Sequence, residues 1–294
     1  MRTRMLGITK VLIAGCVAGA VVLTGVKAQA ESLYGLTLND RLITFDSTAP
    51  GVLTSSRAIS GLQANETLVA LDWSGGVLYG LGSFSRLYSI SPTTGNAALI
   101  GAQFGTALNG NYFGGAIRPS TSTLQIASDL GQNMGVNVNT GVATPGTGLS
   151  YPAGDSGAGQ IPAITGMAWD GPTLTFFGVD FLRNAIVKVQ PSTGNLTTVG
   201  GTQGVDVQPA NGMTISPFTG DMFMATASAA SGSSSVQANL YTVNKATGLM
   251  TLVGLIGIPG DNILLDGLAA VPEPGTWVLA GFGIAALAVL RRRK

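Results

Sequence analysis

The feature of this sequence that most constrains its fold is an internal repeat. A polar turn that ends in glycine follows a strand-like run five times, and successive turn glycines are 44, 46, 53 and 54 residues apart. Short segments of alternating apolar and polar residues flank the turns, and this pattern is typical of β-hairpins. In a hairpin, glycine supplies the positive φ that a tight turn needs. The five turns are 45–51, 90–95, 136–141, 189–194 and 243–248.

A second repeated element, rich in small residues, alternates with the hairpins. A further strand lies between it and the hairpin, most clearly at 77–81. Four strands in a period of roughly 45–55 residues indicate propeller blades, with the small residues on inner strands near a central axis. The element occurs at 68–73, 113–118, 164–169, 211–216 and 265–270.

The two repeats are out of phase at their ends. The region opens on the second strand of a blade, at 33–36, and closes on a first strand, at 265–270. We therefore predict an all-β fold over residues 31–271, a five-bladed propeller of four-stranded blades with velcro closure. In such a closure the last strand completes the first blade and removes an open sheet edge. The alternatives are a β-sandwich or a β-solenoid.

Charge and residue usage exclude several classes of function. Between Glu31 and Ala270 there are seven Lys or Arg against thirteen Asp or Glu, a net charge of −6. Such a domain lacks the basic surface that nucleic-acid binding needs. The chain has no histidine, and its one cysteine, Cys16, precedes the domain. Mechanisms that pair Ser or Cys with His, and the usual zinc sites, are thereby excluded.

The N-terminus has the features of a secretory signal peptide over residues 1–30. A basic start is followed by the apolar run 11–26 and by Ala28-Gln29-Ala30, which predicts cleavage by signal peptidase between Ala30 and Glu31. An uncleaved anchor is one alternative. The other is a lipoprotein, since Ile13-Ala14-Gly15-Cys16 is similar to a lipobox and would make Cys16 the lipidated residue.

The C-terminus, residues 272–294, combines three elements. Pro272-Glu273-Pro274 breaks regular structure, an uncharged helix is predicted over 276–290, and a basic tail follows. The helix is short for a membrane span, and snorkelling cations close part of the gap. The cations should stay cytoplasmic, which places the domain outside and anchors it in the inner membrane until it is processed. The tail consists of Arg291, Arg292, Arg293 and Lys294.

This segment resembles the PEP-CTERM sorting signal of Gram-negative bacteria. The resemblance rests on Val271 and Pro272-Glu273-Pro274, the short glycine-containing helix and the terminal arginine cluster. It implies processing near the motif by an exosortase, followed by release into, or attachment within, an extracellular polysaccharide matrix.

The middle region resembles the domain-of-unknown-function family 4394, which is propeller-like. The likeness is carried by the Leu-Tyr-x-Ile/Val strands, the Thr-Gly turns and the closing Asp266-Gly267-Leu268-Ala269. The family has no agreed activity, so the resemblance implies a fold rather than a function.

Carboxylates are the candidate catalysts, and Asp72 and Asp170 hold similar places at the ends of inner strands, next to Trp73 and Trp169. A glycosidase needs such a pair about 5–10 Å apart. The alternative, which we favour, is that each aspartate caps the turn that follows it.

Aromatic residues and the remaining acids offer weaker candidates. The aromatics either stack on sugars or fill the space between blades, and we favour the second reading. Asp206 and Asp221 offer oxygen ligands for calcium, but no calcium-binding loop motif contains them, so we predict no metal site. No phosphate loop or dinucleotide fingerprint occurs, and no cofactor is predicted. The aromatics are Trp73, Tyr79, Tyr88, Tyr112, Trp169 and Tyr241.

Two functional hypotheses follow. We expect a non-catalytic exported propeller, structural or ligand-binding, that is associated with exopolysaccharide at the cell surface or in the matrix. The alternative is a secreted carbohydrate-active hydrolase that uses Asp72 and Asp170 at the propeller mouth.

Overall fold

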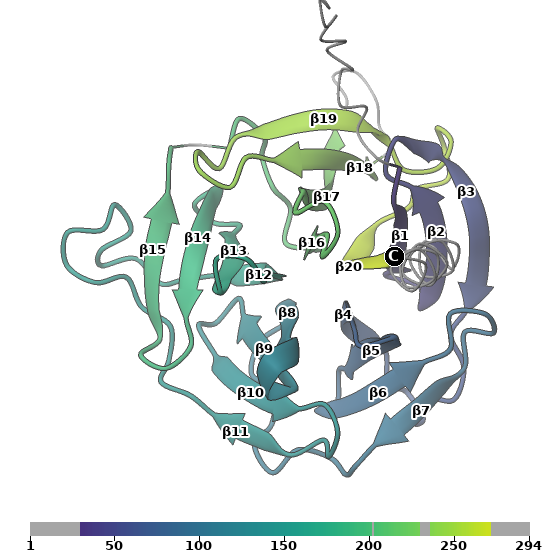
Figure 1. The fold of residues 1–294 in the computed structure, drawn as a ribbon, viewed down its shortest axis with the longest axis horizontal. Coiled ribbons are helices and arrows are strands. Elements are labelled where there is room, and N and C mark those ends of the chain that lie inside the picture. The colour runs from purple at the N-terminus through teal and green to yellow at the C-terminus, as the bar shows by residue number, and fades with distance from the viewer. Residues whose placement is uncertain (1–29, 202, 230–235, 272–294) are drawn as a thin grey trace, which may run out of the picture.

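A computed structural model describes residues 30–271 except for residue 202 and residues 230–235. These residues form five four-stranded antiparallel sheets arranged around a central axis (Figure 1), so the predicted five-bladed propeller is confirmed. Residues 1–29 and 272–294 lie outside the described part. The predictions that concern the signal peptide, Cys16, Pro272-Glu273-Pro274, the helix 276–290 and the basic tail therefore concern residues that the structure does not describe.

Each blade runs from an inner strand at the axis to an outer strand. Blade 1 comprises β20 (Leu265–Val271), β1 (Ser32–Thr37), β2 (Arg41–Asp46) and β3 (Ala49–Ala58). Blade 2 comprises β4 (Leu68–Ser74), β5 (Val77–Gly82), β6 (Arg86–Ile90) and β7 (Ala97–Ile100). Blade 3 comprises β8 (Phe113–Arg118), β9 (Thr123–Ser128), β10 (Asn133–Asn137) and β11 (Ala143–Pro145), with the 3₁₀ helix η1 (Pro119–Thr121) between β8 and β9. Blade 4 comprises β12 (Ile164–Asp170), β13 (Thr175–Asp180), β14 (Ala185–Gln190) and β15 (Asn195–Val199). Blade 5 comprises β16 (Asn211–Ile215), β17 (Met222–Ala229), β18 (Val236–Val243) and β19 (Met250–Leu255).

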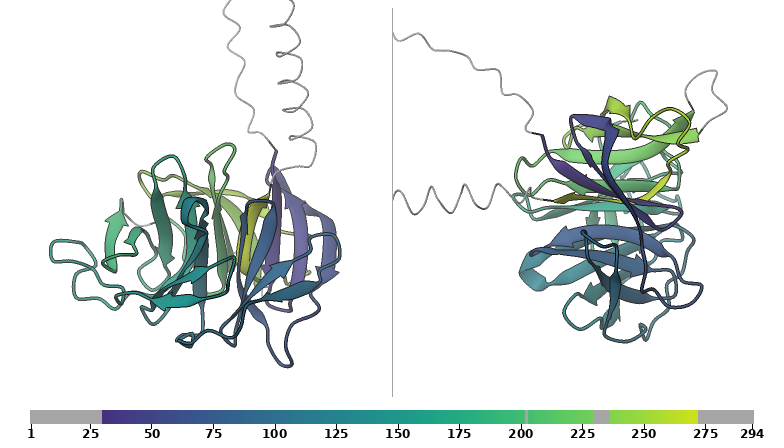
Figure 2. Two further views of the ribbon diagram at one scale, coloured as in Figure 1. Left: turned by 60° about the horizontal axis from the view of Figure 1, so that its bottom comes forward. Right: turned by 90° about the vertical axis from the view of Figure 1, so that its right-hand side faces the viewer.

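The ring is closed by pairing of the first and last strands. β20 lies antiparallel to β1, with Ser32 opposite Val271 and Gly35 opposite Leu268. The two strands lie side by side in purple and yellow (Figures 1 and 2). The predicted velcro closure is therefore confirmed, and blade 1 is assembled from both ends of the domain.

Four of the five predicted glycine turns are found where the repeat places them. Gly95, Gly141, Gly194 and Gly248 each connect the two outer strands of a blade, with φ between 71° and 78°. The first turn also lies within its predicted segment, since β2 ends at Asp46 and β3 begins at Ala49, but the role given to its glycine was wrong, because Gly51 lies within β3. In blade 1 the turn is set instead by Asp46, whose Oδ1 accepts a 2.7 Å hydrogen bond from the backbone N–H of Thr48.

Glycines let the inner strands pack directly against one another at the axis. A Cβ added to Gly114 would lie 2.7 Å from the carbonyl carbon of Gly166. A Cβ added to Gly212 would lie 2.6 Å from the carbonyl carbon of Gly267. The cavity between the inner strands at this level is only about 10 Å³, at the lower limit of what one water molecule requires. The small residues of the sequence repeat thus close the axis instead of lining a channel.

The hydrophobic core is divided into five clusters, one between each pair of neighbouring blades. Tyr88 is fully buried in the cluster between blades 1 and 2, and Tyr79 and Tyr241 are buried in others. These tyrosines therefore fill the space between blades, as favoured from the sequence.

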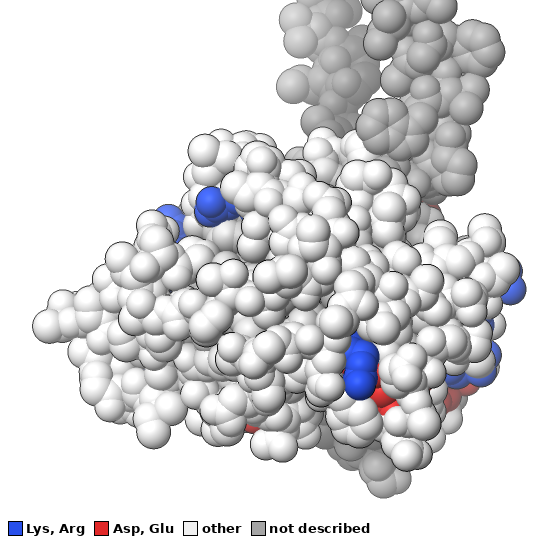
Figure 3. All heavy atoms as spheres, turned by 90° about the horizontal axis from the view of Figure 1, so that it is seen from below, with Lys and Arg blue, Asp and Glu red and all other residues white. Residues whose placement is uncertain are grey.

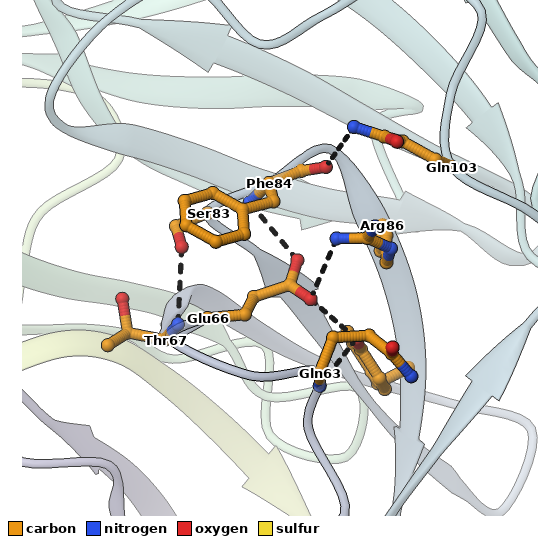
Figure 4. A network of polar contacts seen from close by, with 8 residues as sticks. Gln63, Glu66, Thr67, Ser83, Phe84, Arg86 and Gln103 are labelled. Atoms are coloured by element: carbon orange, nitrogen blue, oxygen red, sulfur yellow. Dashed lines mark hydrogen bonds and ion pairs between the residues drawn. The ribbon is translucent and has the colours of Figure 1, made fainter.

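One buried carboxylate fixes the chain before β4 to blade 2. Glu66 accepts hydrogen bonds from the backbone N–H of Phe84 at 3.1 Å and from Tyr88 at 2.6 Å, and forms a 3.2 Å ion pair with Arg86 (Figure 4). The buried negative charge is thus compensated by three donors. Burial and the bond to Glu66 raise the pKa of Tyr88 to about 12, so its hydroxyl remains a donor at physiological pH.

Charged residues are sparse on the side of the molecule that Figure 3 shows, in keeping with a chain in which 10% of residues are charged. Within the described residues, no helix has the length and hydrophobicity of a membrane span.

Candidate functional site

The candidate site lies where the inner strands end, and we call this end of the axis the mouth. Two cavities adjoin there and share Trp73, Pro119 and Pro217. The outer one, of about 560 Å³, is a mostly apolar basin that Phe218 also lines. The inner one, of about 60 Å³, reaches the ends of all five inner strands. Its other lining residues are Asp72, Ile117, Ala168, Trp169, Thr214, Ile215 and Ala270.

Two of the aromatic residues proposed from the sequence line the same cavity at the mouth. Trp73 at the end of β4 and Trp169 at the end of β12 are both half-buried and line the inner cavity. They hold equivalent places in the inner-strand repeat, so the fold itself brings them to one cavity. A half-buried indole presents an apolar face together with an N–H donor, a combination that suits a ligand with both apolar and polar surfaces.

Asp72 lies within β4 and also lines the inner cavity. The prediction that this aspartate caps the turn that follows it was therefore wrong. Its Oδ1 accepts a 2.8 Å hydrogen bond from the N–H of Trp73, and its Oδ2 accepts a 2.6 Å bond from the N–H of Ile117 in blade 3. The carboxylate therefore joins two blades. Burial raises the pKa of Asp72 to about 7, although these two hydrogen bonds act in the opposite direction.

Asp170 has a different environment. It is fully buried at the end of β12, where it accepts a 2.6 Å hydrogen bond from the hydroxyl of Thr173 in the following turn. It also forms a 3.1 Å ion pair with Lys245 of blade 5. The bond to Thr173 agrees with the turn-cap reading, and the ion pair adds a contact between blades that the sequence did not reveal.

The structure does not bring the two aspartates to one cavity. Asp72 is the only acid among the residues that line the two mouth cavities, and Asp170 lines neither. The mouth as described therefore offers one carboxyl group with a raised pKa, without the second carboxylate that glycosidases use.

Neither proposed calcium ligand belongs to a cluster of acids. Asp206 accepts a 3.0 Å hydrogen bond from the side chain of Asn184, and Asp221 follows the turn after β16. Within residues 30–271, outside the gaps, no three acidic side chains gather as metal ligands do.

Sequence reasoning missed a second cleft, which lies beside the mouth between blades 3 and 4 and has a volume of about 320 Å³. Arg118 ends β8 there, and its guanidinium carbon lies 4.6 Å from the ring centre of Trp169. The repeat contained the signal, because Arg118 holds the place that Trp73 and Trp169 hold in their own inner strands.

Comparison with known structures supports the fold. A protein of unknown function from Bacteroides thetaiotaomicron VPI-5482 is similar, with a TM-score of 0.51 and 16% identity over 76% of this chain. This chain covers 58% of that protein, little more than half of its length. A chain of a nidogen–laminin complex gives a TM-score of 0.50 at 11% identity and matches 83% of this chain and 99% of its own. At these identities the likeness concerns the fold alone.

Comparison with sequence families assigns both parts of the chain. No curated protein matches the sequence. Residues 270–294 match the PEP-CTERM protein-sorting motif, which implies export and exosortase-dependent sorting to the cell surface. Residues 41–269 match the model described as domain of unknown function DUF4394. Since that match covers most of the chain, the protein belongs to the DUF4394 family and carries a PEP-CTERM sorting motif at its C-terminal end.

Proposed function

We propose that this protein is a non-catalytic component of the cell surface or extracellular matrix, and that its propeller binds an exopolysaccharide at the mouth. The PEP-CTERM sorting motif supports the location at the cell surface. The observation that carries the binding role is the pair of half-buried tryptophans, Trp73 and Trp169, at one cavity.

The chemistry of the mouth suits a sugar chain. The basin of about 560 Å³ has the size of a small-ligand site and a mostly apolar lining with few polar groups. Sugar rings have apolar faces that stack on indoles, and hydroxyl groups that bond to polar groups such as the Thr214 hydroxyl and the Asp72 carboxyl. A single carboxyl group favours binding over hydrolysis.

The second candidate is a carbohydrate-active hydrolase, and one observation favours it. A pKa of about 7 is suitable for a general acid, and Asp72 has such a pKa in a cavity with aromatic walls. A second carboxylate about 5–10 Å away, or another nucleophile, would have to come from outside the described lining.

One experiment separates the two. Residues 31–271, which contain the twenty strands of the described structure and the closing β20–β1 pair, are mixed with the host's exopolysaccharide. Co-sedimentation and the release of reducing ends are followed in the same tube. The proposal predicts binding without release, and weaker binding for Trp73→Ala. Phe84→Ala, which removes an exposed aromatic ring from the β5–β6 turn, is the matched control.

The other outcomes contradict the proposal. Release of reducing ends that disappears in Asp72→Asn would establish the hydrolase instead. Absence of binding, in a preparation whose melting transition shows it to be folded, would exclude the polysaccharide role.

A further inference from the structure

The cleft between blades 3 and 4 contains a positive charge that has no negative partner in the described part of the chain. Arg118 is the only charged residue among the eight that line it. The two ion pairs in the described part of the chain are formed by other residues, Arg86 with Glu66 and Lys245 with Asp170. The rest of the lining is mostly neutral and polar: Thr121, Thr123, Gln125, Phe176, Gln190, Pro191 and Ser192.

Among the described residues, packing against aromatic rings holds the guanidinium group in place, and no hydrogen bond uses its donors. The Cζ atom of Arg118 lies over two aromatic rings, 4.6 Å from the centre of Trp169 and 5.2 Å from that of Phe176. These rings stabilise the positive charge but provide no acceptor oxygen. The Nε atom is buried and has no hydrogen-bond partner among the described residues. None of the other guanidinium N–H groups bonds to an acceptor among the described residues, so these donors are available to an anion in the cleft.

We propose that this cleft binds an acidic group, a carboxylate or a sulfate, on a sugar residue of a polysaccharide. The planar guanidinium group of Arg118 matches the oxygens of such a group and forms two parallel hydrogen bonds with them. Hydroxyl and amide side chains around it, such as Thr123 and Gln190, suit the hydroxyl groups of a sugar. A cleft of about 320 Å³ lies at the small end of the range of ligand pockets, as expected for one or two sugar residues.

This inference rests on the proposed function for its choice of a polysaccharide, and it specifies an acidic one. The cleft adjoins the mouth, because Trp169 lines the inner mouth cavity and also stacks against Arg118. A chain that crosses the mouth can therefore place an acidic residue at Arg118. The net charge of −6 over residues 31–270 makes non-specific adhesion of a polyanion unfavourable, so binding would have to depend on this local cation.

The fluorescence of Trp169, which lies against Arg118, can report binding in the cleft. Residues 31–271 contain two tryptophans, and Trp73→Phe leaves Trp169 as the sole one. The Trp73→Phe protein is titrated with polygalacturonate, dextran sulfate and neutral dextran, while Trp169 fluorescence is recorded. We expect one of the two acidic polymers, or both, to change the signal saturably, and dextran to leave it unchanged. Comparison of the polygalacturonate and dextran sulfate titrations shows whether the cleft binds a carboxylate or a sulfate group.

Substitution at the cation provides the decisive comparison. Arg118→Met keeps an unbranched apolar stem but removes the guanidinium charge, and should weaken binding at least tenfold, as loss of a charge-assisted pair implies. Arg57→Met removes an exposed arginine on β3 and should have no effect. Should Arg118→Met fail to fold, Ser192→Glu in the exposed turn of the cleft introduces a repelling charge without touching the core.

The outcomes separate this inference from the proposed function. Arg118-dependent binding of an acidic polymer supports the site even where the host's exopolysaccharide does not bind. Binding of the exopolysaccharide that is unchanged in Arg118→Met and Ser192→Glu, with no response to either acidic polymer, overturns the inference and leaves the proposed function standing.

Discussion

The carboxylate of Asp72 in β4 accepts a 2.6 Å hydrogen bond from the backbone N–H of Ile117 in β8, and so ties blade 2 to blade 3 at the mouth. A similar link joins blades 5 and 1, where the hydroxyl of Thr214 accepts a 3.1 Å bond from the N–H of Ala270. The same strand ends thus line the candidate site and hold the ring together.

The raised pKa of Asp72 predicts that stability depends on pH. Between the ordinary value of 3.8 and the folded value of about 7, the folded protein holds a proton that the unfolded chain has released. The free energy of unfolding should therefore fall as the pH rises from about 4 to about 7, and change little above that. Burial, with the nearby charge of Asp40, raises the pKa of Asp266 to about 7 as well. Burial also raises the pKa values of Asp40 and Asp180, so several groups contribute.

Urea unfolding of residues 31–271 at pH 5, 6, 7 and 8 checks this. Asp72→Asn should make the pH dependence shallower, and Asp72→Asn with Asp266→Asn shallower still. Asp72→Asn should also cost about 1–3 kcal/mol at pH 5, because its amide NH₂ would face the backbone N–H of either Trp73 or Ile117, which would lose its acceptor. Equal slopes in the wild-type and double-variant proteins would contradict the assignment.

The close approach of the inner strands predicts that glycine is required at the axis. In Gly267→Ala the new Cβ would meet the Cβ of Leu71 at 2.7 Å. We expect a loss of about 3 kcal/mol or more, which corresponds to a fall of roughly 6–12 °C in Tm for a domain of this size. Gly105→Ala is the control, since a Cβ there meets nothing within 4 Å. Equal melting temperatures for the two variants would argue against a closed axis.

Closure through β20 predicts a sharp limit for truncation. Residues 31–271 should behave as a monomer in size-exclusion chromatography. Residues 31–264 lack β20, which leaves the edge of β1 without its partner strand and exposes the core cluster between blades 1 and 5. We expect this shorter chain to aggregate. A monomeric 31–264 with an unchanged Tm would show that the closing strand is dispensable.

The bonds of Glu66 predict a graded response to two substitutions. Glu66→Ala leaves Arg86 and Tyr88 without their shared acceptor and should cost about 3–5 kcal/mol, as for a broken buried ion pair. Tyr88→Phe removes one donor to the charged carboxylate, together with the acceptor of the Gln63 N–H, and should cost about 1.5–3 kcal/mol. Thermal unfolding of both variants tests the order, and a milder effect for Glu66→Ala than for Tyr88→Phe would contradict it.

Local chemistry made the fold predictable. The turn repeat and the inner-strand repeat placed five outer hairpins, four of them with the predicted turn glycine, and all five inner strands, because both signals depend on residues that are close in sequence. The one wrongly assigned glycine is in blade 1, where the side chain of Asp46 stabilises the turn and Gly51 lies in the strand that follows.

The site was less predictable, since it depends on how blades face one another. Nothing near Asp72 in the sequence indicates a bond to Ile117, 45 residues away. Similarly, Asp170 pairs with Lys245 of a neighbouring blade, and Arg118 stacks on Trp169 of another. The sequence could nominate Trp73 and Trp169 because the repeat aligns them, whereas the cleft around Arg118 is visible only once blades 3 and 4 are placed.

The central claim, that the mouth is the ligand-binding face, is tested most directly by hydrogen–deuterium exchange. Residues 31–271 are labelled with and without soluble fragments of the host's exopolysaccharide. We predict slower exchange in the turns at the mouth, residues 74–77, 119–122, 171–174 and 217–221. The turns at the opposite end, residues 83–85, 129–132 and 181–184, should not change. Protection confined to the opposite end, or absent from both, would contradict the account.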